Sequence, residues 1–270
     1  MSEAILPLDP ANDTPRSAYA VLQLRATLAT VGILFALAGI AWWSTAARSR
    51  DTESMVQGLS AVGRAMPFDM GVLVFLGMWT TMMVAMMLPT VAPIVLLHRM
   101  VLRRRGESAS KTLVFGSGYL LVWAAAGVIP LSILIGFRHF AHESQWLDRA
   151  GGVVLVIAGL YQFSKWKAAC LKACRTPLSF LMTHDFGRGV YGALKVGISH
   201  GLYCFGCCWA LMAVLFVVGL MNLVWMAAIG MVFLAEKNWR HGVGLTRVVG
   251  CMVVVFGLAV LVYPSMLAAP

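Results

Sequence analysis

The sequence predicts an all-α protein, a bundle of about seven helices that cross a membrane. Of its 270 residues, 60% are hydrophobic and 12% are charged, whereas an ordinary soluble domain carries about 25% charged residues. Residues 196–235 contain no Asp, Glu, Lys or Arg, and a helix of this length would extend about 60 Å, roughly two bilayer crossings. No polar stretch between the apolar segments is long enough for a second, soluble domain. We therefore expect one transmembrane domain over residues 24–263.

The first four predicted spans are separated by charged or turn-forming segments. Residues 1–23 contain acidic residues and prolines where a cleavable signal peptide would have basic residues and an apolar core, so we expect a cytoplasmic tail and a retained first span. The second span begins after Asp69, and the third follows a strongly basic loop. The fourth is the shortest, with Asp148 and Arg149 at its start. These four spans are predicted at residues 24–45, 70–97, 112–137 and 146–163.

The last three spans follow a second basic segment. The long apolar stretch can form two of them, because residues 219–222 contain the Gly and Asn that favour a tight turn. The sixth span ends near Lys237, where charged residues reappear. A short outer tail, residues 264–270, follows the seventh. These three spans are predicted at residues 190–218, 223–237 and 245–263.

Lys and Arg are unevenly distributed among the predicted loops. Five follow the second span, five follow the fourth, and three lie at or after the end of the sixth, whereas acidic residues balance those after the first and third. Basic loops stay in the cytoplasm, so we expect a multi-pass protein of the bacterial inner membrane, with its N-terminus inside and its C-terminus outside. Topology thus accounts for the net charge of +10, and no nucleic-acid partner is expected.

A histidine and three cysteines lie within the longest apolar stretch. His200, Cys204 and Cys207 fall within roughly 60° of one helix face, with Cys208 at its edge. One imidazole and two thiolates suit Cu(I) or, alternatively, Zn(II). Free cysteine also packs well as a small apolar residue, but three cysteines one turn from a histidine favour a metal site. A disulfide between them would be strained and would lie toward the reducing cytoplasm.

A second cysteine pair lies in the basic segment after the fourth predicted span. Cys170 and Cys174 share one helix face at a spacing of four residues, and the neighbouring Lys and Arg favour thiolates. We interpret the pair as an entry or exit station for a soft metal ion. The alternative is an interfacial loop that carries two reduced thiols.

Methionines form two stripes on the second predicted span. Met82 and Met86 lie one turn apart, as do Met83 and Met87, and all four precede Pro89. Thioethers are neutral, soft ligands that suit Cu(I), although methionine is also a common filler of apolar cores. Pro89 and Pro93 each remove a backbone donor and are predicted to kink the helix.

Two charged residues end the sixth predicted span. Glu236 is expected at a depth similar to that of His200, where it would ligate the metal or orient the imidazole. Lys237 is interpreted as a helix-end residue that reaches the membrane interface.

Several of these blocks together resemble a known family. They are residues 82–93, 200–212 and 219–226, Glu236 with Lys237, Tyr161 with Gln162, and the pair Cys170 and Cys174. The chain resembles, over residues 68–263, a bacterial family of predicted metal-binding integral membrane proteins that was long filed as a domain of unknown function. The resemblance implies metal binding, and some relatives are associated with copper supply to copper oxidases. The chain departs from the family pattern in lacking a proline between the Tyr-Gln block and the cysteine pair.

The sequence therefore favours a membrane protein that binds Cu(I) and transports it or delivers it to copper enzymes. Its expected partners are the lipid bilayer and a copper enzyme or copper chaperone. No phosphate-binding Gly-Lys-Ser/Thr motif indicates ATP-driven transport, and a binding protein is favoured over an enzyme. Two alternatives stay open: a membrane thiol oxidoreductase that uses Cys204, Cys207 and Cys208, and a structural subunit of a larger membrane complex.

Overall fold

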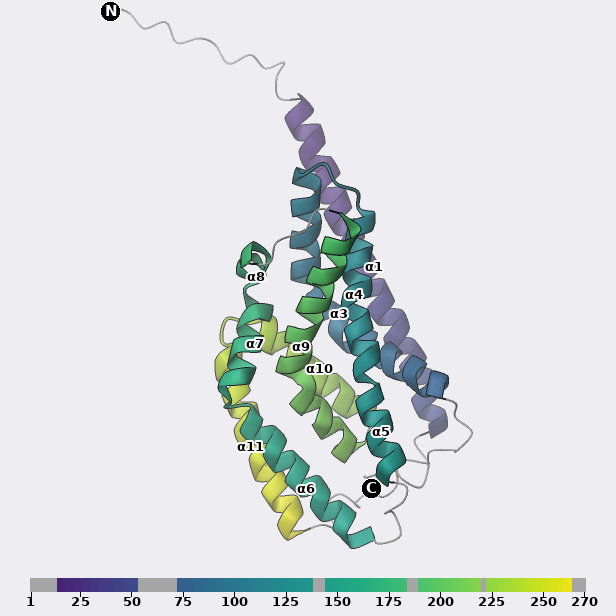
Figure 1. Ribbon diagram of the computed structural model, residues 1–270, viewed down its shortest axis with the longest axis vertical. Coiled ribbons are helices and arrows are strands. Elements are labelled where there is room, and N and C mark those ends of the chain that lie inside the picture. Colours follow the sequence, from purple (N-terminus) through teal and green to yellow (C-terminus); the bar gives the residue numbers. More distant parts are fainter. Residues whose placement is uncertain (1–13, 53–71, 138–143, 184–188, 220–221, 264–270) are drawn as a thin grey trace, which may run out of the picture.

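Every regular element that the structure describes is a helix, which confirms the predicted all-α class. The computed structural model describes residues 14–52, 72–137, 144–183, 189–219 and 222–263. Most of the predicted cytoplasmic tail, residues 1–13, and the predicted outer tail, residues 264–270, lie outside this part of the chain. The bundle is elongated (Figure 1). Its helices are α1 (Thr14–Thr52), α3 (Val72–Arg104), α4 (Ser110–Ala126), α5 (Val128–Phe137), α6 (Ser144–Tyr161), α7 (Lys165–Arg175), α8 (Pro177–Thr183), α9 (Val190–Val218), α10 (Leu223–Asn238) and α11 (Gly242–Val262).

Five helical segments are long and apolar enough to cross a membrane. They are Leu24–Ala47, Val72–Arg104, Ser110–Ile133, Val190–Val218 and Gly242–Val262. They correspond to the first, second, third, fifth and seventh predicted spans. The fourth and sixth also form helices, but α10 has only 16 residues and the apolar part of α6 is limited to Arg149–Tyr161. Length and composition thus support five spans, and the number seven stays a prediction.

Helix α3 continues through both of its prolines. A proline leaves the carbonyl four residues earlier without its helical hydrogen bond, and for Pro89 this carbonyl is that of Ala85. The Trp42 indole of α1 donates to the Ala85 oxygen at 3.0 Å. An aromatic side chain therefore replaces the missing backbone donor and fastens α1 to α3.

Glycines allow α4 to approach α9 closely. A Cβ atom on Gly118 of α4 would lie 2.7 Å from the carbonyl oxygen of Leu194, and one on Gly197 of α9 would overlap the carbonyl oxygen of Phe115. Small residues of this kind let neighbouring membrane helices pack backbone against backbone. Helix α9 also contacts α6, α7 and α10. The cysteine-bearing helix is therefore enclosed by four others.

Candidate metal centre

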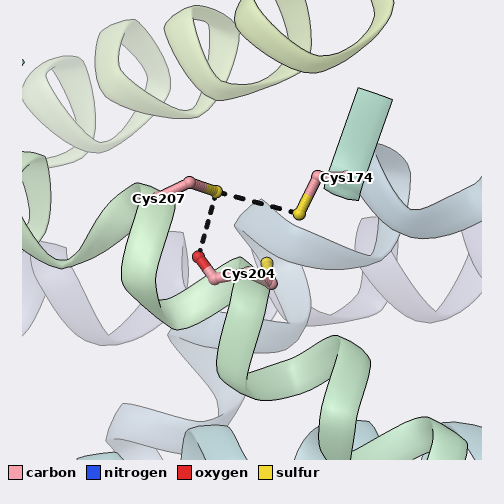
Figure 2. A group of neighbouring side chains, drawn as sticks. All are labelled: Cys174, Cys204 and Cys207. Carbon is pink, nitrogen blue, oxygen red and sulfur yellow. Dashed lines mark hydrogen bonds between the residues drawn. The ribbon is translucent and has the colours of Figure 1, made fainter. Parts of the chain in front are cut away.

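Three cysteine side chains from two helices meet inside the bundle. Cys174 comes from α7, while Cys204 and Cys207 lie one turn apart on α9. Their sulfur atoms all lie within 4.8 Å of one another, and those of Cys174 and Cys207 approach to 3.9 Å (Figure 2). Three sulfurs bound to one ion at about 2.3 Å would be about 4 Å apart. These three residues, hereafter the thiol cluster, are thus close to the spacing of a three-sulfur metal site.

A buried lysine contacts the thiol cluster. Lys237 of α10 is only 7% exposed, and its ammonium group donates to Cys204 Sγ at 3.1 Å and to Thr90 Oγ1 at 3.2 Å. An ammonium group only donates hydrogen bonds, so the Cys204 sulfur is the acceptor. A positive charge at this distance stabilises negative charge on the sulfur. Lys237 therefore does not reach the membrane interface, where the sequence predicts it. Its position in an otherwise apolar helix is the sequence feature that could have indicated a functional role.

Two further groups adjoin the cluster. The Tyr119 hydroxyl of α4 lies 3.1 Å from Cys204 Sγ, so a second polar group contacts the sulfur that accepts from Lys237. Cys208 is fully buried, and its sulfur lies 3.5 Å from that of Cys207. Cys207 Sγ also donates to the carbonyl oxygen of Cys204 at 3.1 Å (Figure 2). The cluster is thus polarised, with acceptor character at Cys204 and donor character at Cys207.

A buried ion pair fixes α7, the helix that supplies Cys174. The Lys167 ammonium donates to both carboxylate oxygens of Glu236, at 2.9 and 3.1 Å, and also to Gln162. Arg175 donates to the backbone carbonyl of Glu236. Ser164 caps the start of α7 by accepting from the Lys167 amide at 3.0 Å. Glu236 thus holds α7 against α10. The role that the sequence predicts for it, metal ligation or orientation of His200, stays a prediction.

His200 lies outside the thiol cluster. Its ring is buried among aromatic side chains, with centroids 5.1 Å from Phe180, 5.9 Å from Tyr119 and 6.3 Å from Phe115. In the part of the chain that the structure describes, the group of close metal-ligating atoms contains Cys174 and not His200. The structure therefore joins the two cysteine motifs, which the sequence treats as separate sites.

All four methionines of the predicted stripes are buried in α3. Met87 adjoins the thiol cluster through Lys237, whose ammonium lies 3.8 Å from the Met87 sulfur. Met86 faces α10 near Gly230. The stripe therefore leads along α3 to the edge of the thiol cluster. Methionines that only fill the apolar core would be buried in the same way.

Cys170 lies one turn before Cys174 and is only partly buried. A Cβ atom on Gly206 would lie 2.6 Å from its sulfur, so the absence of a side chain at Gly206 lets this thiol rest on the backbone of α9. Cys170 thus extends the group of thiols one turn along α7 from Cys174.

In the part of the chain that the structure describes, these features define an all-helical protein with helices that can cross a membrane and a cluster of two buried cysteines and one half-buried cysteine that can hold a metal ion. The family model of the PpoB2 copper chaperones matches residues 76–260 of the 270. The chain therefore belongs to the PpoB2 copper chaperone family, which confirms the resemblance to a copper-associated bacterial family. The matched residues include the cysteine motifs, the methionine stripes and Lys237. No curated protein and no solved structure matches the chain.

The two roles considered for Glu236 predict different results for a charge-removal experiment. Glu236→Gln leaves Lys167 buried without a carboxylate partner. Breaking such a buried ion pair lowers the free energy of unfolding by about 3 kcal/mol or more. We expect a large loss of thermal stability and of bound metal. The double variant Lys167→Met/Glu236→Gln removes both charges, and it should recover most of the stability and the metal content. If the double variant regains stability while its metal content stays low, Glu236 is a ligand and not an anchor of α7.

Proposed function

We propose that the protein binds Cu(I) at Cys174, Cys204 and Cys207 within the bacterial inner membrane and delivers it to a copper enzyme. The observation that carries this proposal is the convergence of three thiols from separate motifs beside the buried ammonium of Lys237. Thiolate donors select soft ions such as Cu(I), and membership of a copper chaperone family supports delivery as the purpose of binding.

Charge balance supports a monovalent ion at this centre. Cu(I) bound by two thiolates carries one negative charge, which the ammonium of Lys237 neutralises. The third cysteine can then remain a neutral thiol ligand. An unneutralised charge in a buried site costs several kcal/mol. Zn(II) with three thiolates would also be neutral beside Lys237, but structural zinc usually takes four ligands, and the thiol cluster has three. Cu(I) is therefore the better match, with zinc as the alternative.

The arrangement of the sulfur atoms suggests a route for the ion. Cys170, one turn before Cys174 on α7, would receive Cu(I), and ligand exchange would pass it to Cys174 and Cys207. Met87, at the edge of the centre, would accept it from Cys204 and lead it to the buried methionines of α3. Each step exchanges one soft sulfur ligand for another, so the ion is never without donors inside the apolar bundle.

Metal analysis of the purified full-length protein tests the proposal. The protein is purified in detergent under reducing conditions, and its copper and zinc contents are measured after incubation with each metal alone. We expect one copper per chain and retention of Cu(I) against a competing chelator. The Cys251→Ser variant is the matched control, because Cys251 is an exposed thiol of α11. Failure to retain copper would instead favour the thiol oxidoreductase or the structural subunit.

The proposed topology has seven spans, with the N-terminus inside and the C-terminus outside, and residues 24–263 form its single transmembrane domain. The N-terminal end of α1, the α3–α4 turn and the start of α9 lie at one end of the bundle, and α5 lies at the other (Figure 1). This arrangement supports a common side for the N-terminal end of α1 and the basic α3–α4 turn, while α7 and the basic α10–α11 connection lie nearer the middle of the bundle (Figure 1). A reporter fused after Pro270 is expected to give a periplasmic signal, whereas a cytoplasmic signal would require an even number of spans.

The methionine stripe provides a separate test of delivery. Met→Leu changes at positions 82, 83, 86 and 87 preserve volume and usually cost less than about 1.5 kcal/mol each, but they remove the sulfur lone pairs. We expect the fourfold variant to accumulate normally and to bind copper at the thiol cluster. It should, however, support less activity of a dependent copper enzyme when copper is limiting. Equal enzyme activity with the wild type and the fourfold variant, at equal expression, would indicate that these methionines only fill the core.

A further inference from the structure

A large apolar groove lies between α1, α3 and α4, apart from the thiol cluster. Its volume is about 540 Å³, and its lining includes Leu34 of α1, Leu88 and Val91 of α3, and Leu120 of α4. Along α3 it extends from Leu88 to Arg99, which corresponds to about 16 Å of helix. This is roughly half of the 30 Å hydrocarbon thickness of a bilayer. The groove therefore has the length of one membrane leaflet.

One end of the groove is polar and positively charged. Arg99 Nε and Thr112 Oγ1 are buried there, and neither atom has a hydrogen-bond partner among the described residues. Thr112 is only 7% exposed. Arg99 also lines an adjoining cavity of about 80 Å³ together with Arg103 and Arg104. Buried polar atoms without partners are costly, so this end lacks an acceptor that would satisfy both side chains.

The charge at this end is not neutralised within the described part of the chain. The ion pairs of Lys111 with Glu107 and of Lys167 with Glu236 include no arginine of the groove. Glu107 belongs to the same α3–α4 turn, but Lys111 holds it at 2.5 Å and keeps the pKa of its carboxyl group below the usual value. Arg99, Arg103 and Arg104 therefore present positive charge at the head of an apolar groove.

We propose that this groove binds an anionic glycerophospholipid. One acyl chain lies between α1, α3 and α4, and the phosphate accepts hydrogen bonds from Arg99, Arg103 and the Thr112 hydroxyl. Guanidinium groups match phosphate oxygens in geometry and charge. A zwitterionic headgroup would bring its own ammonium toward three arginines, which disfavours it. An uncharged isoprenoid would fill the groove but would leave the polar atoms unsatisfied.

Lipid retention by the full-length protein tests this proposal. The detergent-purified protein is incubated with equal amounts of phosphatidylglycerol and phosphatidylcholine of identical acyl chains, and bound lipid is measured by native mass spectrometry. Phosphatidylglycerol should be retained preferentially. Arg99→Gln should lower this preference about tenfold, the effect of losing one charged hydrogen bond. Lys195→Gln, at an exposed lysine of α9, removes the same charge away from the groove and should not change the preference.

A groove-filling variant separates this site from general association with lipid. Gly116 lines the groove, and a Cβ atom there would meet nothing within 4 Å, so Gly116→Leu is expected to place its side chain in the open space of the groove. It should lose both lipids and keep the unfolding temperature of the lipid-free protein. The proposal is overturned by equal retention of the two lipids, by equal effects of Arg99→Gln and Lys195→Gln, or by full lipid retention in Gly116→Leu. None of these results depends on copper.

Discussion

The Cys174→Ser variant is expected to lose bound copper as completely as Cys204→Ser or Cys207→Ser. Each change removes one of three sulfur donors from the thiol cluster. Even residues that only support a ligand cost 10–100-fold in metal affinity when they are replaced, so loss of a ligand should weaken Cu(I) binding by at least about 100-fold. Competition with a Cu(I) chelator, measured on the purified variants, gives the affinities.

His200→Phe is the informative comparison for these cysteine variants. The sequence places His200 in the metal site, whereas the structure surrounds its ring with Phe115, Tyr119 and Phe180. Phenylalanine keeps an aromatic ring in this pocket but has no nitrogen ligand. We expect it to retain wild-type copper affinity. If His200→Phe loses copper while Cys174→Ser keeps it, the centre is the one that the helical spacing of α9 predicts, and the thiol cluster is not the site.

Lys237→Met should weaken copper binding almost as strongly, although lysine is not a ligand. The side chains are similar in length, but the variant lacks the charge that offsets a copper–dithiolate unit. Leaving this charge uncompensated costs several kcal/mol, which corresponds to a loss of about 100-fold or more in copper affinity. Chelator competition measures the loss, and X-ray absorption of the copper-loaded variant tests whether its coordination changes.

Thermal unfolding of the metal-free Lys237→Met variant tests whether Lys237 is needed for folding or only for balancing the charge of bound copper. Burying an ammonium group is costly, so removing it should leave the metal-free protein equally stable or more stable. Lys172→Met, at an exposed lysine of α7, is the matched control. Wild-type copper affinity in Lys237→Met would contradict this role, because the contact of Lys237 with Cys204 would then not stabilise the bound copper.

The helices could be predicted well because membrane helices must satisfy their backbone groups internally. The predicted fifth span coincides with α9, Val190–Val218. The predicted turn at residues 219–222 is confirmed by Asn222, whose side chain accepts from the Val224 and Trp225 amides to start α10. These features depend on residues within one or two helical turns. The contact of the Trp42 indole with the Ala85 carbonyl, 43 residues along the chain, was not predicted, and the kink expected at Pro89 and Pro93 stays a prediction.

The metal centre could be predicted only in part, because half of its geometry is tertiary. Helical spacing alone brings Cys204 and Cys207 to one face. The same spacing adds His200, and nothing in it indicates that the Cys174 sulfur lies beside the other two. That convergence depends on where α7 docks, and the ion pair between Lys167 and Glu236, 69 residues apart, is one of the contacts that hold α7 in the bundle. Lys237 was missed because a lysine at a helix end ordinarily reaches water, and here it turns inward to Cys204.

The ion pair between Lys167 and Glu236 has a consequence for biosynthesis. Cys170, Cys174, Cys204 and Cys207 are all translated before α10, yet α7 is held in place by a carboxylate of α10, and Cys204 meets its cationic neighbour only there. A nascent chain that has not yet been translated through residue 237 therefore carries its thiols without the partners that gather and balance them. If the thiol cluster is the copper site, as we propose, we expect copper loading to follow translation of α10.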